Sequence, residues 1–215
     1  LRGGSFLAAR SLDARVDAAL AAVHSSPRAL VYLYWGELDK VGHVQGCQSW
    51  EWGDALELID RAIARLVAGV AADTSVYVTA DHGMVDCPHA LRIDLAHDRE
   101  LAAGVRHVGG EPRALQLYCE PGAADAVLAT WHERVDDRAW VFSRDEAVVS
   151  GLFGRVADHV LPRIGDVIVA MRDNFAIVDS LTARPAFLAL VGLHGSLTPV
   201  ETAIPRLQVA ARDSR

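Results

Sequence analysis

Aspartate and histidine residues follow three separate apolar segments of this chain, each within eight residues of the segment's end. The segments are residues 29–35 (ALVYLYW), 75–80 (SVYVTA) and 187–191 (FLALV), and the residues that follow them are Asp39 and His43, Asp81 and His82, and His194. In open α/β sheets, ligands bind beyond the carboxyl ends of the strands, so we expect these side chains to meet at one sheet edge. Carboxylate oxygens and imidazole nitrogens are ligands of zinc and similar divalent ions. The pattern therefore predicts a metal site.

The spacing within each motif supports this prediction. Asp39 and His43 are related as i and i+4, which places both side chains on the same side of a helical turn. Asp81 and His82 are adjacent, so they can share one ion only where the backbone leaves the strand and turns at Gly83. Taken singly, the motifs also fit a loop with an N-capping aspartate, a tight turn and a hydrogen-bonded structural histidine. Their joint occurrence after three apolar segments favours the metal site.

The elements that would position these residues indicate an α/β protein. Residues 29–35 and 75–80 are predicted strands, and residues 54–70 between them carry the apolar stripe of an amphipathic helix. The order strand, helix, strand is typical of a βαβ unit, which predicts a largely parallel sheet between helices. Residues 11–23 have helical periodicity, with Ser11 as the expected N-cap.

The middle of the chain has the pattern of a small α+β insert. Strands are predicted at 114–119 and 139–142 and a helix at 123–135, and Ser143 with Glu146 has capping-box spacing. We therefore expect a main α/β domain of residues 1–93 and 162–215 and an insert of residues 94–161. Further strands of the main sheet are predicted at 166–171 and 187–191, followed by a short helix or edge segment at 199–211.

The composition is that of a globular protein with an acidic balance. The 215 residues include 21 Lys and Arg against 28 Asp and Glu, a formal net charge of -7. No basic cluster is present to bind phosphate backbones, so no nucleic-acid polymer is expected as a partner. No uninterrupted apolar run reaches the ~18 residues of a membrane span, so no membrane association is expected. The three scattered cysteines are interpreted as reduced thiols, which favours a cytoplasmic location.

Three motifs together resemble the alkaline phosphatase superfamily, and within it the type I phosphodiesterase/nucleotide pyrophosphatase family. They are Y-x-x-x-x-D-x-x-G-H at 34–43, T-A-D-H-G-M at 79–84 and G-L-H-G-S-L-T-P at 192–199. The resemblance implies an alkaline-phosphatase-like sandwich that holds two zinc ions and transfers a phosphoryl or nucleotidyl group through a Thr or Ser intermediate. Small anionic phosphoesters or nucleotides are the implied substrates, because bound ions would outweigh the negative net charge.

The resemblance also implies a role for individual residues. Asp39, His43 and His194 match the ligands of one zinc ion, and Asp81 and His82 match two ligands of the other. Tyr34 matches a position near the substrate in some members, but a core tyrosine on a buried strand is an equally good interpretation.

A further Asp ligand and the nucleophilic Thr or Ser that the resemblance implies have no matching motif in this sequence. We therefore expect the C-terminal half of a phosphodiesterase, which binds one metal ion in a three-ligand site and has little activity alone. The same ligands would also suit hydrolysis of phosphomonoesters, phosphonates or sulfate esters, or a phosphomutase reaction. A non-catalytic metal-binding fragment is the alternative from another class. An unpaired sheet edge would favour a homo-oligomer.

Overall fold

The computed structural model describes residues 3–211, which divide into two compact units. The first, here called the helical unit, comprises residues 3–41, 48–81 and 205–211. The second, here called the sheet unit, comprises residues 42–47 and 82–204. The division passes through helix α2 (Glu37–Gln45). The predicted boundaries of an insert at residues 94–161 stay a prediction.

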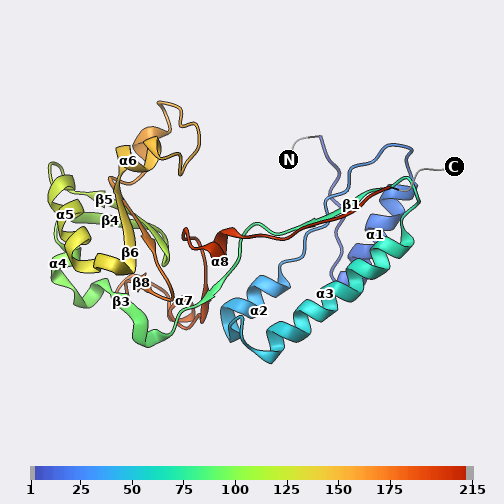
Figure 1. Cartoon of the computed structure of the whole chain (residues 1–215), viewed down its shortest axis with the longest axis horizontal. Coiled ribbons are helices and arrows are strands. Elements are labelled where there is room, and N and C mark those ends of the chain that lie inside the picture. Colours follow the sequence, from blue (N-terminus) through green and yellow to red (C-terminus); the bar gives the residue numbers. More distant parts are fainter. Residues whose placement is uncertain (1–2, 212–215) are drawn as a thin grey trace. The chain divides into compact units, whose positions relative to one another are not determined.

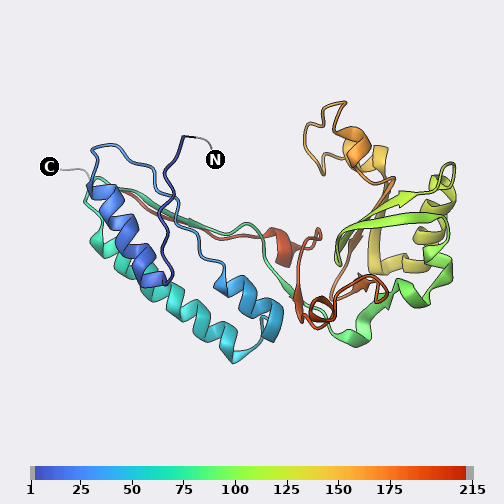
Figure 2. The ribbon, with the colours of Figure 1, turned by 180° about the vertical axis from the view of Figure 1, so that it is seen from behind.

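The helical unit is built on two helices, α1 (Leu12–His24) and α3 (Trp50–Gly69), which lie side by side (Figures 1 and 2). Each begins at a serine, Ser11 or Ser49, whose hydroxyl accepts a hydrogen bond from the amide three residues further on. These caps satisfy amides that have no partner within the helix. The predicted helices at 11–23 and 54–70 are thus confirmed, the second with four extra residues at its start. The contact buries Leu12, Val16 and Ala62.

Residues 29–35 form no strand, contrary to the prediction. Leu33 and Trp35 pack against the core between the two helices, whereas Leu30 and Tyr32 are 99% and 77% exposed. A strand requires a neighbouring strand for its backbone amides and carbonyls. Among residues 3–211 no strand pairs with this segment. The apolar run therefore meets helices on one side only.

The second predicted strand of the βαβ unit does form, but with a different partner. Strand β1 (Val76–Thr79) pairs antiparallel with β10 (Arg206–Val209), near the end of the described chain. The predicted βαβ unit is therefore absent from the part of the chain that the structure describes.

The sheet unit contains a four-stranded antiparallel sheet, whose strands lie in the order β4 (Val105–Glu111), β5 (Ala114–Cys119), β7 (Val167–Met171) and β6 (Ala139–Ser143). All five residues of β7 are buried. Helix α5 (Ala124–Val135) packs against β6 and β7. Trp131 of this helix is fully buried, and its Nε1–H donates to the carbonyl of Leu101 at 3.0 Å. This sheet and helix hold the main core of the unit.

Shorter elements complete the sheet unit. Strand β3 (Arg92–Asp94) pairs parallel with β8 (Ala176–Val178), and β2 (Val85–Asp86) pairs antiparallel with β9 (Gly192–Leu193). The remaining helices are α4 (Arg99–Ala102), α6 (Arg144–Val149), α7 (Pro185–Leu188) and α8 (Pro199–Thr202), with 3₁₀ turns η1 (His89–Leu91), η2 (Leu95–His97), η3 (Asp136–Arg138) and η4 (Leu161–Arg163). Helix α6 has the predicted capping box of Ser143 and Glu146.

The protein is thus mixed α/β as predicted, but the prediction of a largely parallel sheet is wrong. Among the described strands, β3 and β8 form the sole parallel pair, and the sheets have two or four strands. Two physical reasons account for this. A tight hairpin joins β4 to β5, and such a turn connects antiparallel strands. Pro185 starts helix α7 in the region predicted as the strand 187–191, since proline suits the first turn of a helix.

No helix within residues 3–211 has both the length and the apolar content needed to cross a bilayer.

Candidate metal centre

Three residues from two parts of the chain bring metal-ligating atoms close together. Helix α2 carries Asp39 and His43 one turn apart, and His194 directly follows strand β9. A carboxylate oxygen of Asp39 and one ring nitrogen from each histidine all lie within 4.8 Å of one another, and the three residues are partly buried. Ligating atoms this close together can serve one ion, and zinc binds nitrogen and oxygen at about 2.0–2.2 Å.

The backbone on either side of this group is held by direct contacts between α2 and the segment that ends in His194. The amide of Val191 donates to the carbonyl of His43 at 2.7 Å. At Gly192, a Cβ atom would lie 2.4 Å from the carbonyl oxygen of Gly42, so only glycine permits this approach. Two glycines in contact therefore let the helix and the strand come close enough for their histidines to meet.

The hydrogen bond of His43 determines which ring nitrogen faces the site. Its Nδ1 lies 2.7 Å from the carbonyl oxygen of Gly192. A carbonyl oxygen only accepts hydrogen bonds, so Nδ1 must carry the proton. In the neutral ring, Nε2 then carries the lone pair that a metal ion binds, an arrangement common among metal-binding histidines.

A third histidine stacks on this group. The rings of His82 and His194 have centroids 3.6 Å apart with an interplanar angle of 16°, and the rings of His43 and His194 are 5.2 Å apart. Nδ1 of His82 lies 2.9 Å from the carbonyl oxygen of Gly83, so this nitrogen is also the donor. The three imidazoles thus form one continuous cluster in the sheet unit.

Three of the predicted site residues lie outside the group of three ligating atoms: His82, which stacks on His194, and also Asp81 and Tyr34. Asp81 is exposed and directly precedes His82. Tyr34 is 54% exposed, and its backbone carbonyl accepts a hydrogen bond from Arg15. Tyr34 is therefore exposed, and it does not lie on a buried strand, which was one of its two interpretations from the sequence.

A buried ion pair close to the histidines was not predicted from the sequence. The side chains of Arg113 and Glu201 are 0% and 1% exposed and form two parallel hydrogen bonds, Nε to Oε1 and Nη2 to Oε2, both of 2.7 Å. Glu201 follows Thr198 with capping-box spacing, and this T-x-x-E pattern was the one signal that could have drawn attention to it. Nothing local to Arg113 indicates a partner 88 residues away.

The charges of this pair are maintained by hydrogen bonds. Burial alone would raise the pKa of Glu201, but hydrogen bonds from Arg113, Thr198 and the Ser196 amide hold the pKa below its ordinary value. Nearby Cys87 shows the opposite effect: burial raises the pKa of its thiol, although Arg113 lies beside it. Glu201 is therefore a carboxylate at neutral pH, and Cys87 is a neutral thiol.

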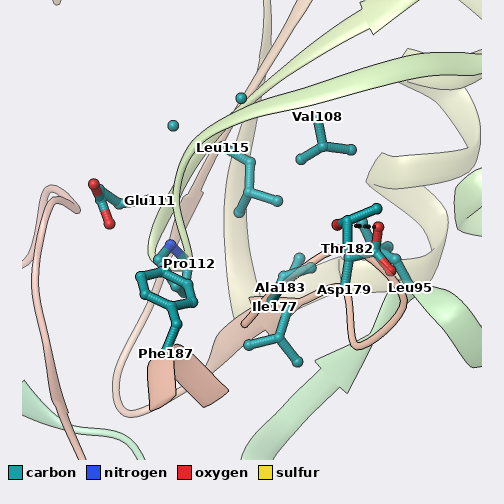
Figure 3. Close-up of a pocket in the computed structure, with 13 residues that line it drawn as sticks. Leu95, Val108, Glu111, Pro112, Leu115, Ile177, Asp179, Thr182, Ala183 and Phe187 are labelled. Atoms are coloured by element: carbon teal, nitrogen blue, oxygen red, sulfur yellow. Dashed lines mark hydrogen bonds between the residues drawn. The ribbon is translucent and has the colours of Figure 1, made fainter. Parts of the chain in front are cut away.

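An open pocket of about 140 Å³ lies elsewhere in the sheet unit, between the β4–β5 hairpin and the segment that leads into α7 (Figure 3). Its lining is largely apolar, with Leu115, Ile177 and Phe187 among the residues that point into it. Its Asp179 carboxylate accepts a hydrogen bond from the Thr182 hydroxyl at 2.8 Å and so stabilises its own turn. The chemistry-bearing side chains are therefore those of the histidine cluster, not those of this pocket.

Comparison with known proteins identifies the family. The sequence profile of the type I phosphodiesterase / nucleotide pyrophosphatase family matches residues 5–197. The match covers most of the chain, and the protein therefore belongs to this family. No curated protein sequence matches the chain.

Solved structures of ectonucleotide pyrophosphatase/phosphodiesterase 5 have the same fold. The human protein matches with a TM-score of 0.73 at 18% identity, over 94% of this chain and 52% of its own. The murine protein matches with a TM-score of 0.74 at 19% identity, over 94% and 52%. An inactive variant of the murine protein, in complex with AMP, matches equally well over 94% and 53%. The chain thus spans about half the length of the structures it matches.

Proposed function

We propose that this chain supplies the metal-binding part of a hydrolase that cleaves phosphodiester or pyrophosphate bonds. The observation that carries the proposal is the group formed by Asp39, His43 and His194, whose ligating atoms lie within 4.8 Å. One carboxylate and two imidazoles form a donor set that suits zinc. Because Nδ1 of His43 carries the proton, the lone pair available to a metal ion is on Nε2. Membership of the phosphodiesterase family supports the proposed reaction class.

Asp81 and His82 are proposed as ligands of a second divalent ion. The stacking of His82 on His194 supports this assignment, because it places a second imidazole beside the first site. Two ions would lower the pKa of a hydroxyl nucleophile and neutralise charge on the phosphoryl oxygens during an in-line displacement. The residues of this chain would hold the ions in place. The nucleophilic Thr or Ser and a further Asp ligand would come from polypeptide outside the 215 residues.

The proposed substrate is a small anionic phosphoester or a nucleotide. The murine structure in complex with AMP supports a nucleotide, and Tyr34 is the residue of this chain proposed to lie near it. The net charge of -7 supports a small metal-bound anion over a nucleic-acid polymer. We also propose a cytoplasmic location, because three scattered cysteines are too few for a disulfide framework, and self-association into a homo-oligomer.

Zinc analysis of the purified chain tests the three-ligand site. We expect the wild-type chain to retain zinc after dialysis and His194→Ala to lose it, since two ligands hold zinc far more weakly than three. His132→Ala is the matched control, because His132 is exposed on α5. A wild-type chain without zinc, or unchanged stoichiometry in His194→Ala, would contradict the proposed site.

Hydrolysis of bis-p-nitrophenyl phosphate tests the position of the nucleophile. We expect the zinc-loaded chain to show little turnover, because no Thr or Ser motif for the nucleophile is found in the sequence. Turnover at a rate typical of such enzymes would show that the chain contains its own nucleophile. The chain could instead bind zinc and stay inactive even when a polypeptide that carries the proposed nucleophile is added. That result would favour the non-catalytic metal-binding alternative.

A further inference from the structure

The buried pair of Arg113 and Glu201 connects to both segments that carry the clustered histidines. Oε1 of Glu201 accepts a hydrogen bond from the amide of Ser196, two residues after His194, at 3.0 Å. The backbone carbonyl of Glu201 accepts a hydrogen bond from the amide of Gly83, directly after His82, at 2.7 Å. One residue therefore holds the backbone next to each of two stacked imidazoles.

The contact with Gly83 is unusually close. A Cβ atom at this position would lie 1.9 Å from the carbonyl oxygen of Val200, so no other residue type fits without moving the backbone. Thr198 donates its hydroxyl proton to Oε2 of Glu201 and starts helix α8. The turn after His82 is thus packed directly against the helix that presents Glu201.

Arg113 joins this arrangement to the four-stranded sheet. It lies in the β4–β5 hairpin, where its guanidinium also donates to the carbonyls of Phe175 at 2.6 Å and Met171 at 3.3 Å. The Ser196 hydroxyl donates to the same Met171 carbonyl at 2.5 Å. Because Met171 ends the buried strand β7, these hydrogen bonds tie the segment after His194 to the core of the four-stranded sheet.

These contacts are an inefficient way to stabilise a fold. Removing two charges from water costs several kcal/mol per ion, and apolar replacements of buried pairs are often neutral or stabilising. A paired guanidinium and carboxylate does, however, fix direction as well as distance, because two parallel hydrogen bonds define one plane. The pair is suited to holding two backbone segments in register.

We propose that Arg113 and Glu201 are positioning residues that set His82 and His194 in the geometry required for metal binding. The proposal rests on the proposed function of the histidine cluster. It assigns to the pair a contribution to metal affinity that is separate from its contribution to folding.

The decisive variant replaces both partners, Arg113→Met together with Glu201→Leu, so that no charge is left buried alone. We expect this double variant to fold, and to bind zinc at least about tenfold more weakly than the wild type in a chelator competition assay, the range found for residues that orient metal ligands. Arg144→Met is the control: it breaks the ion pair with Asp166 in the same unit without a contact to either histidine segment. Zinc affinity of the control should equal that of the wild type.

Hydrogen exchange in the metal-free protein gives a second readout that does not depend on zinc. The amide of Ser196 should exchange about tenfold faster in Glu201→Gln than in the wild type, because its charged acceptor is replaced by a neutral one. A merely destabilising change, as in Arg144→Met, would not single out this amide. If the double variant does not fold, Arg113→Lys decides the question in the zinc assay, because it keeps a positive charge beside Glu201 but not the two parallel hydrogen bonds.

The outcomes separate the two proposals. A wild-type chain that binds no zinc would overturn the proposed function. A wild-type chain that binds zinc, with unchanged affinity and unchanged Ser196 exchange in folded variants of the pair, would overturn the positioning role alone. Weaker binding in the pair variants but not in Arg144→Met would support it.

Discussion

Apolar segments of similar composition have opposite environments in the two units of this protein. Strand β7 in the sheet unit is buried at all five positions, between β5 and β6. In the helical unit, Leu30 and Tyr32 of residues 29–35 are 99% and 77% exposed, and Tyr77 of β1 is 61% exposed. Composition therefore predicts which residues tend to be buried, but burial itself requires neighbouring strands and a covering layer.

The largest effect is expected in the core of the sheet unit. Leu117 is fully buried in β5, so Leu117→Ala removes apolar contacts and leaves a cavity in the core. We expect a loss of about 2–5 kcal/mol in the free energy of unfolding, measured by urea denaturation. A loss below about 1 kcal/mol would show that this core is loosely packed, and the contrast between the units would disappear.

Local sequence signals predicted several elements of each unit correctly. The helix caps at Ser11 and Ser143 and the strands β5, β6 and β7 appear where spacing and composition placed them. These features depend on residues a few positions apart, which a sequence displays directly. The pairing of the strands depends on distant segments, and the predicted pairing was wrong, because residues 29–35 have no strand partner among the described residues.

In the candidate site, too, the local features were predicted better than the contacts between distant segments. The i, i+4 spacing predicted that Asp39 and His43 share one side of a helical turn, and both lie on α2. That His194 would join them followed from the family resemblance and from the assumption of a common sheet edge, which the antiparallel sheets do not provide. Its actual cause is the contact of Gly42 with Gly192. The Arg113–Glu201 pair was missed because its members are distant in sequence and of a type common on surfaces.

The second prediction concerns acid stability and the buried carboxylate. The pKa of Glu201 is lower in the folded protein than in the unfolded chain, so unfolding takes up a proton in the acid range. The stability that Glu201 contributes is complete above its unfolded pKa of about 4.3 and is lost as the pH falls through the folded value. We expect the urea midpoint of the wild type to fall more steeply with acid than that of Glu201→Gln, which does not titrate there.

This comparison isolates one residue from the other carboxylates of the sheet unit. The pKa of Asp98 is also lowered, first of all by its hydrogen bond with Arg134, and its contribution is the same in both proteins. Parallel acid profiles for the wild type and Glu201→Gln would show that Glu201 has no depressed pKa in solution.

A smaller effect is expected at the helix caps, one in each unit. Ser143 caps α6 and its own amide donates in return to the carboxylate of Glu146, whereas Ser11 caps α1 by accepting a hydrogen bond from the amide of Ala14. We expect Ser143→Ala to cost about 1–2 kcal/mol and Ser11→Ala about 0.5–1 kcal/mol, because the first substitution also breaks the hydroxyl's contact with Glu146. Equal losses would indicate that the reciprocal contact contributes nothing measurable.

The smallest effect is expected at the exposed face of residues 29–35. Leu30 is 99% exposed, so Leu30→Ala should change the free energy of unfolding by no more than about 0.5 kcal/mol. The same substitution at buried Leu117 provides the reference for a covered leucine. A loss above about 1.5 kcal/mol at Leu30, or a change in oligomeric state by sedimentation, would show that this face is covered in solution. Because an exposed apolar face favours association, a concentration-dependent loss would point to a second copy of the chain as the cover.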